Sequence, residues 1–226
     1  MNVGYSPLQN SDVRDAIRYA IDYDGLIEFV LQGTAVKHQS FIPKGLLGHN
    51  PSIPYMHDSE KAKQLLAHAG YSEGFDVELK CLNYSPRVDI AMKVKSDLAE
   101  IGINISVVQL TPEEMVEALF SRETQFWLWE FGTDYADPDA KAKSFAHSDS
   151  LGEDATVKLL AWAAQYVNLE TSVLVEQAAR ELDSQKRADL YKQVTEIILD
   201  DGPFAMLFTK VHQYGARVEV MNSIRK

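Results

Sequence analysis

Between residues 75 and 131 the hydrophobic positions change their period in a regular order. Apolar residues alternate with polar ones over Phe75–Leu82, recur at helical spacing over Pro86–Ile101, and alternate again over Ile103–Leu110. A second helical pattern covers Thr111–Phe120, and Gln125–Phe131 is an aromatic run typical of a buried strand. Strand, helix, strand, helix and strand in this order predict a sheet of βαβ units with right-handed crossovers.

The chain before this region predicts helices separated by one long irregular segment. Asp12–Ile21 has apolar residues at helical spacing, with Asp12 as the expected N-cap, and a short helix is expected over Gly25–Leu31. Residues 33–57 are rich in glycine and proline, so we expect a long loop that is functional or pinned over the domain surface. Ser59–Ala69 has the pattern of a further helix.

The last third of the chain is mostly helical in pattern. Helices are expected over Asp154–Tyr166, Thr171–Leu182 and Ser184–Leu199, the last with its first residue as N-cap. The short apolar run Phe204–Phe208 is expected to return as a strand. We therefore predict the α/β class, with a mixed sheet flanked by helices, in a single domain over residues 1–226.

Composition and charge argue against several kinds of partner and location. The 226 residues are 46% hydrophobic and 24% charged, as in ordinary soluble domains. The net charge of −11 disfavours a nucleic-acid partner, because binding phosphate backbones needs a positive face. The one cysteine, Cys81, excludes an internal disulfide and is expected to be a buried thiol. No apolar run suits a membrane span and Met1–Gly4 begins no secretory leader, so we expect a cytosolic protein or an internal piece of a longer secreted chain.

The acidic motif from residue 134 to residue 139 is the strongest candidate for chemistry. Asp137, Pro138 and Asp139 have the order of an N-cap, an N1 proline and a first-turn acid, so a helix start explains them. Asp134 has no such explanation. It follows the strand pattern ending at Phe131, where ligands gather in open α/β sheets, and a carboxylate there suits an ammonium group. The alternative is a surface aspartate that accepts hydrogen bonds from turn amides.

Aromatic and basic residues near this motif are further candidates for contact with a ligand. Trp127 and Trp129 are either core on both faces of a covered strand, or one ring reaches a ligand. Phe131 and Tyr135 flank Asp134 and would enclose the bound group. Arg122 is either a clamp for a ligand carboxylate or a solvated residue of a turn.

Other functional classes find little support in the sequence. The three aspartates lack the glycine and the late glutamate of a calcium loop, and no two of the six histidines have a metal-ligand spacing. No nucleophile with a base and no glycine-rich phosphate loop stands out. We therefore expect no enzyme, no metal and no cofactor.

Short motifs with a shared order run along nearly the whole chain: Asp12-Val13-Arg14 with Tyr19-Ala20-Ile21-Asp22, Gly33-Thr34-Ala35, Phe41-Ile42-Pro43, Glu60-Lys61-Ala62-Lys63 with Ala69-Gly70-Tyr71, Ile101-Gly102-Ile103, Asp134-Tyr135-Ala136-Asp137-Pro138-Asp139, Tyr166-Val167-Asn168 and Asp201-Gly202-Pro203. In this order they resemble the C-terminal part of the family 5 extracellular solute-binding proteins, the dipeptide- and oligopeptide-binding proteins of ABC importers.

The resemblance implies one lobe of a two-lobe fold of the periplasmic-binding-protein type II, class C. It implies a peptide ligand held between this lobe and an N-terminal lobe absent here, ABC permease subunits as partners, and a place on the periplasmic or extracellular side of a bacterial membrane. Asp134 aligns with the family residue that binds the ligand's α-amino group. The alternatives are a non-peptide ligand such as a nickel or haem complex, and an interaction domain that reuses the lobe without transport.

The sequence departs from the family pattern in several places. Phe131 stands where tryptophan is usual, Leu169 where proline is, and Ser172 where aspartate is. Residues 141–164 match poorly, and we expect them to line or border the ligand cleft. These departures leave the fold expectation in place and bear on the ligand class.

Overall fold

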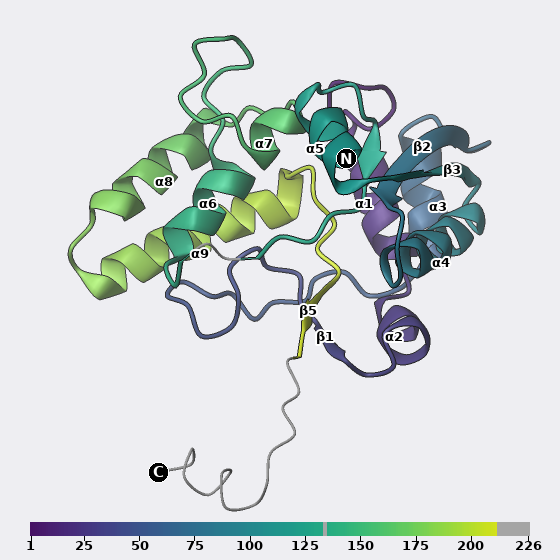
Figure 1. Cartoon of the computed structure of the whole chain (residues 1–226), viewed down its shortest axis with the longest axis horizontal. Coiled ribbons are helices and arrows are strands. Elements are labelled where there is room, and N and C mark those ends of the chain that lie inside the picture. The colour runs from purple at the N-terminus through teal and green to yellow at the C-terminus, as the bar shows by residue number, and fades with distance from the viewer. Residues whose placement is uncertain (133–134, 212–226) are drawn as a thin grey trace, which may run out of the picture.

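The computed structural model describes residues 1–132 and 135–211 of the chain. Figure 1 shows the helices and strands, which follow one another in the order α1 (Ser11–Ala20), α2 (Tyr23–Gly25), the π-helical turn η1 (Leu26–Val30), β1 (Ala35–Lys37), α3 (Ser59–His68), β2 (Phe75–Leu82), α4 (Arg87–Ala99), β3 (Ile103–Leu110), α5 (Pro112–Phe120), β4 (Phe126–Trp127), α6 (Pro138–Ala146), α7 (Leu160–Ala163), α8 (Leu169–Arg180), α9 (Ser184–Asp201) and β5 (Phe208–Lys210).

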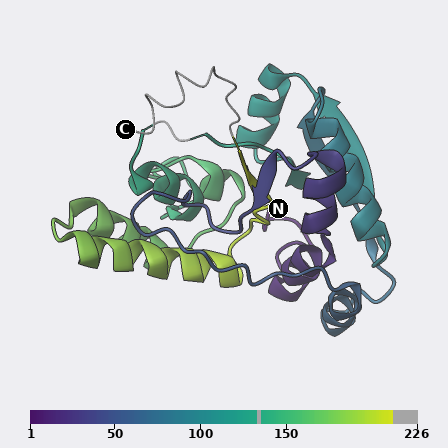
Figure 2. The ribbon, with the colours of Figure 1, turned by 90° about the horizontal axis from the view of Figure 1, so that it is seen from below.

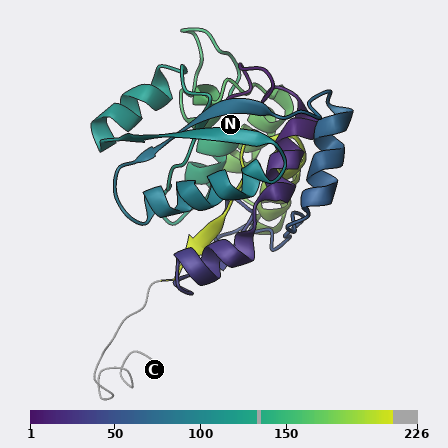
Figure 3. The ribbon, with the colours of Figure 1, turned by 90° about the vertical axis from the view of Figure 1, so that its right-hand side faces the viewer.

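A three-stranded parallel sheet is the frame of the fold, with strand order β3-β2-β4. β2 pairs with β3 along its whole length, from Phe75 opposite Ile103 to Leu82 opposite Leu110. Helix α4 makes the crossover between these strands and packs on both of them, as Figure 3 shows. The predicted βαβ arrangement is thus confirmed. The antiparallel pairing of β1 with β5 lies in a separate two-stranded sheet.

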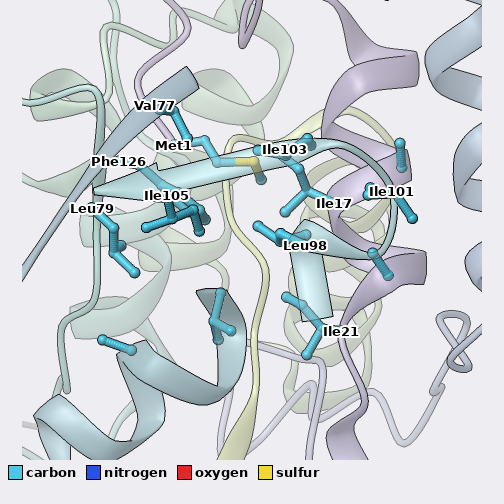
Figure 4. Packing of buried hydrophobic residues seen from close by; sticks show 14 of the residues in the cluster. Met1, Ile17, Ile21, Val77, Leu79, Leu98, Ile101, Ile103, Ile105 and Phe126 are labelled. Atoms are coloured by element: carbon cyan, nitrogen blue, oxygen red, sulfur yellow. The ribbon is translucent and has the colours of Figure 1, made fainter. Parts of the chain in front are cut away.

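Two hydrophobic cores hold the helices in place. The first core packs β2, β3 and α4 against α1 and α3, and Figure 4 shows Ile17, Leu98 and Ile103 meeting within it. The second core joins α6, α7, α8 and α9, with Tyr191 and Val194 completely buried. Figures 1 and 2 both show α8 and α9 at one end of the molecule and the parallel sheet with α3 and α4 at the other.

The strand expected over Gln125–Phe131 forms only at Phe126–Trp127, so that prediction is wrong beyond Trp127. The amide of Leu128 still donates to the carbonyl of Lys80 on β2, after which the chain leaves the sheet. Further on, the carbonyls of Phe131 and Gly132 accept hydrogen bonds from the Lys141 ammonium group, at 2.7 and 2.6 Å. The Lys141 side chain thus satisfies backbone carbonyls that the prediction would have paired with a neighbouring strand.

Two expectations for the C-terminal part are also only partly right. The helix expected over residues 154–166 is confined to α7, and the returning strand begins at Phe208, after the apolar run 204–207.

The N-cap of α9 is Asp183, whose carboxylate accepts hydrogen bonds from the amides of Gln185 and Lys186, and Ser184 is the first helical residue. In the same way Asn10, not Asp12, caps α1.

The long irregular segment after β1 is pinned across the molecule. The side chain of Gln39 bonds to both the amide and the carbonyl of Tyr55. The Tyr55 hydroxyl lies within hydrogen-bond distance of two acceptors, the Asp15 carboxylate at 2.9 Å and the Leu199 carbonyl at 2.7 Å. Cys81 is buried in β2, as predicted. Among the described residues, no helix is both long and apolar enough to cross a membrane.

Candidate functional site

A cavity of about 450 Å³ opens where the two cores meet. Its floor comes from the parallel sheet, with Leu79 of β2 and Phe126 and Trp127 of β4. Its walls come from α4, from residues 38–43, from α6 and from the chain leading into β5. The cavity therefore lies beside the end of β4 and the segment that follows it, which is where the sequence predicted a ligand.

Aromatic rings form one wall of the cavity. Phe145 of α6 stacks on Phe41 with ring centroids 5.8 Å apart, and meets Phe131 and Phe204 edge to face at 5.8 and 5.0 Å. Trp129 lines the same space. This wall offers a flat, apolar surface to a ligand side chain or ring, and its interlocked rings hold it in one arrangement.

The charged side chains that line the cavity are basic, with one acid among the described lining residues. The Glu130 carboxylate pairs with the Arg87 guanidinium and, at 2.8 Å, with the Lys210 ammonium group. Burial and the charge of Arg87 lower the pKa of Lys210. Lys141 is 3% exposed and its ammonium group also lies 4.6 Å from the centre of the Phe131 ring.

His38 lines the cavity and stacks on His49, with ring centroids 5.2 Å apart. Burial and the neighbouring His49 lower the pKa of His38 to about 4, so its imidazole is neutral at pH 7. In the part of the chain that the structure describes, no three His, Cys, Asp or Glu side chains are placed to hold a metal ion together. His212 lies outside that part.

The structure brings two of the five predicted ligand residues to the cavity. Trp129 and Phe131 line it. Asp134 lies outside the described residues. Tyr135 is 51% exposed and its hydroxyl donates to Asp139 at 3.2 Å, away from the lining residues.

The fifth, Arg122, is also absent from the described lining. Its guanidinium lies over the Trp162 ring, 4.3 Å from the ring centre, and donates to the Leu151 carbonyl at 2.9 Å. These contacts fasten the loop before α7. The ligand roles of Tyr135 and Arg122 stay predictions from the sequence.

Asp137 has the predicted capping geometry and one further contact. Its carboxylate accepts from the amide of Asp139 at 2.9 Å and also binds Arg187 of α9 through both guanidinium ends, at 2.8 and 3.0 Å. Burial opposes ionisation of Asp137, but the Arg187 guanidinium and the Asp139 amide outweigh it and lower the pKa of that carboxyl. The pair ties the start of α6 to α9.

Sequence reasoning missed Arg87, Glu130 and Lys210 as cavity residues. Glu130 carried a usable signal, since it is a single acid inside the aromatic run from 126 to 131. Arg87 and Lys210 carried none, because each lies in an ordinary polar context and meets Glu130 only through the tertiary fold. Lys141, by contrast, lines the cavity and belongs to the segment 141–164, which the sequence analysis expected to line or border the cleft.

Comparison with known proteins agrees with the fold. The family model for the bacterial extracellular solute-binding proteins, family 5 middle region, matches residues 1–153. The dipeptide-binding protein of Escherichia coli is 31% identical over 219 residues, which cover 90% of this chain and 39% of that protein. The heme-binding protein A of Haemophilus influenzae is 29% identical, over 90% of this chain and 37% of that protein.

A solved structure gives the same result. The periplasmic binding protein DppA of Helicobacter pylori, in complex with the peptide STSA, superimposes with a TM-score of 0.80 at 28% identity, over 92% of this chain and 40% of that one. The likeness confirms the predicted fold of an α/β lobe. The chain thus spans about 40% of the length of these three proteins. It belongs to family 5 of the bacterial extracellular solute-binding proteins.

Proposed function

We propose that this chain is the ligand-binding lobe of the substrate-binding component of an ABC importer, and that it takes peptides. The cavity carries the proposal. Its volume of about 450 Å³ falls within the range of small-molecule sites, roughly 300–1,000 Å³. An aromatic wall with a few charged groups suits a ligand that has an apolar body and polar ends.

The proposed protein has a second lobe that closes over this cavity like a hinge. Support comes from the coverage, because the relatives continue well beyond the region that they share with this chain. Closure would remove the ligand from water and add contacts from the other side. The ABC permease would bind the closed form, on the periplasmic or extracellular side of the membrane. The role is binding, not catalysis, in keeping with the family description.

Within this proposal, Trp129 and Phe131 pack on the ligand and Asp134 accepts hydrogen bonds from its α-amino group. The two aromatic residues line the cavity. The role of Asp134 is supported by its position in the family motif and by its sequence distance of three residues from Phe131.

A haem complex is the second candidate ligand. Neutral imidazole is a common ligand of iron, and His38 lies in the cavity wall with its pKa lowered to about 4. One of the relatives is named for binding heme. The aromatic wall would suit a porphyrin face as well as a peptide side chain.

Mass spectrometry of the ligands carried by the complete protein distinguishes these candidates. The protein is purified without added ligand, then denatured, and the released small molecules are identified. We expect short peptides with free amino termini. Recovery of haem or of a metal complex, with peptides absent, would contradict the peptide proposal and favour the second candidate.

A further inference from the structure

The segment that follows β4 lines the cavity although it lies outside the sheet. Leu128 makes the last hydrogen bond to β2, and the next backbone–backbone hydrogen bond along the chain between described residues joins Asp137 to Tyr135. Trp129 and Phe131 lie between these two points, and both line the cavity. Something other than sheet pairing must therefore hold the backbone that carries these two rings.

Lys141 of α6 makes the contacts that hold this backbone. Its ammonium group donates to the carbonyls of Phe131 and Gly132, at 2.7 and 2.6 Å. The same group lies 4.6 Å from the centre of the Phe131 ring and 5.8 Å from the centre of the Phe145 ring. One side chain thus contacts both the backbone of the segment and two rings of the aromatic wall.

Packing alone does not explain a lysine at this position. Lys141 is 3% exposed, and taking an ammonium group out of water is costly. A methionine would fill much the same volume without that cost. The hydrogen bonds to two consecutive carbonyls do explain the lysine, because they fix a stretch of backbone beyond the last hydrogen bond of the sheet.

We propose that Lys141 is a positioning residue of the ligand site, which holds the aromatic wall and so gives the protein a preference for ligands with an aromatic or bulky apolar side chain. The inference rests on the proposed function and adds the residue that shapes one part of the site. Lys141 acts through Trp129 and Phe131, whose rings receive the ligand side chain. Without the ammonium group the segment loses two hydrogen bonds, and its rings are no longer held in one arrangement.

A merely structural role of Lys141 gives a different expectation. If Lys141 only ties α6 to the segment after β4, its loss lowers the melting temperature and weakens every ligand to the same degree. If Lys141 positions the aromatic wall, its loss weakens most the ligands that gain affinity from contact with the rings. The ratio of the affinities for an aromatic and a small ligand therefore separates the two roles.

The experiment titrates two peptides, Ala-Phe-Ala and Ala-Ala-Ala, into the complete protein by calorimetry. The peptides differ only in one phenyl group, so the ratio of their dissociation constants measures what the aromatic wall contributes. Burial of the phenyl group is expected to make Ala-Phe-Ala bind about tenfold more tightly, or better. Lys141→Met is expected to weaken Ala-Phe-Ala by about tenfold and Ala-Ala-Ala by less than about threefold, which removes most of the preference.

Further variants locate the effect, each with its fold verified by circular dichroism. Lys141→Arg keeps donors for the carbonyls and is expected to keep most of the preference. Lys143→Met is the matched control on the same helix, because the Lys143 ammonium group pairs with Asp139 at 2.8 Å and Lys143 is not among the described lining residues. It is expected to change neither affinity. Lys141→Gln, which is shorter and uncharged, takes the place of Lys141→Met if that variant fails to fold, with the same loss of preference expected.

Three outcomes would overturn the inference by itself. In the first, the unsubstituted protein binds both peptides equally, so that the wall receives no side chain. In the second, Lys141→Met keeps its fold and its full preference for Ala-Phe-Ala. In the third, Lys141→Met weakens both peptides by the same factor, which assigns Lys141 to the scaffold. Failure of the unsubstituted protein to bind either peptide would instead overturn the proposed function, and the inference with it.

Discussion

Replacing Asp134 by asparagine in the complete protein is expected to weaken binding of a free-amine peptide by about thirtyfold or more. The substitution keeps the shape of the side chain and removes its charge. A buried ammonium group left without its counter-ion costs ~2–5 kcal/mol, and each factor of ten corresponds to about 1.4 kcal/mol. The expectation comes from the family motif and from the cavity that Phe131 lines, three residues earlier in the chain.

Repeating the titration with an N-acetylated peptide completes a thermodynamic cycle between Asp134 and the ligand's ammonium group. Acetylation removes the ammonium group, so Asp134→Asn should weaken the acetylated ligand hardly further in the same calorimetric titration. Asp137→Asn is the matched control. It loses the ion pair with Arg187 and should lower the melting temperature while leaving affinity nearly unchanged. Equal losses for both ligands in Asp134→Asn would assign Asp134 to the scaffold and contradict its role as amine receptor.

Replacing Gly74 by alanine is expected to destabilise the fold by about 2–5 kcal/mol. Gly74 and Gly102 precede β2 and β3 and lie against one another, and a Cβ on Gly74 would overlap the carbonyl of Gly102. That carbonyl accepts the hydrogen bond of the Phe75 amide, so moving it disturbs the start of the strand pair. In addition, Gly74 has a φ of +73°, where an L side chain is strained.

Gly70→Ala separates the strain from the overlap. Gly70 has a φ of +86° as well, but a Cβ there would meet nothing within 4 Å, so only the strain of about 1–2 kcal/mol is expected. Urea unfolding of both variants, compared with the unsubstituted protein, measures the difference. Equal destabilisation by the two substitutions would show that the contact between Gly74 and Gly102 adds nothing.

The two long strands were predictable because local and tertiary preferences agree there. β2 and β3 form over the predicted ranges, Phe75–Leu82 and Ile103–Leu110, each with period-two alternation and a glycine just before it. The range predicted for β4 was too long because an aromatic run indicates that side chains are buried, not that the backbone pairs with a neighbouring strand. Trp129 and Phe131 are indeed partly buried, yet they pack at a cavity beyond the end of the strand.

The candidate site was only half predictable from the sequence. The place after the third strand and the aromatic residues Trp129 and Phe131 follow from local pattern. The ion pairs of Glu130 with Arg87 and Lys210 do not, because these three residues come together only when α4, β4 and β5 are arranged in space. The helix caps at Asn10 and Asp183 were missed by one or two residues because neighbouring polar residues could cap equally well.

The central claim, that this chain supplies half of a peptide-binding cleft, is tested most directly by calorimetry on two proteins. One is the complete protein and the other is residues 1–226, with its fold verified by circular dichroism. The account predicts that the complete protein binds its peptide at micromolar concentration or below, while the lobe alone binds poorly, because the contacts made on closure are missing. Binding by residues 1–226 as tight as that of the complete protein would contradict it.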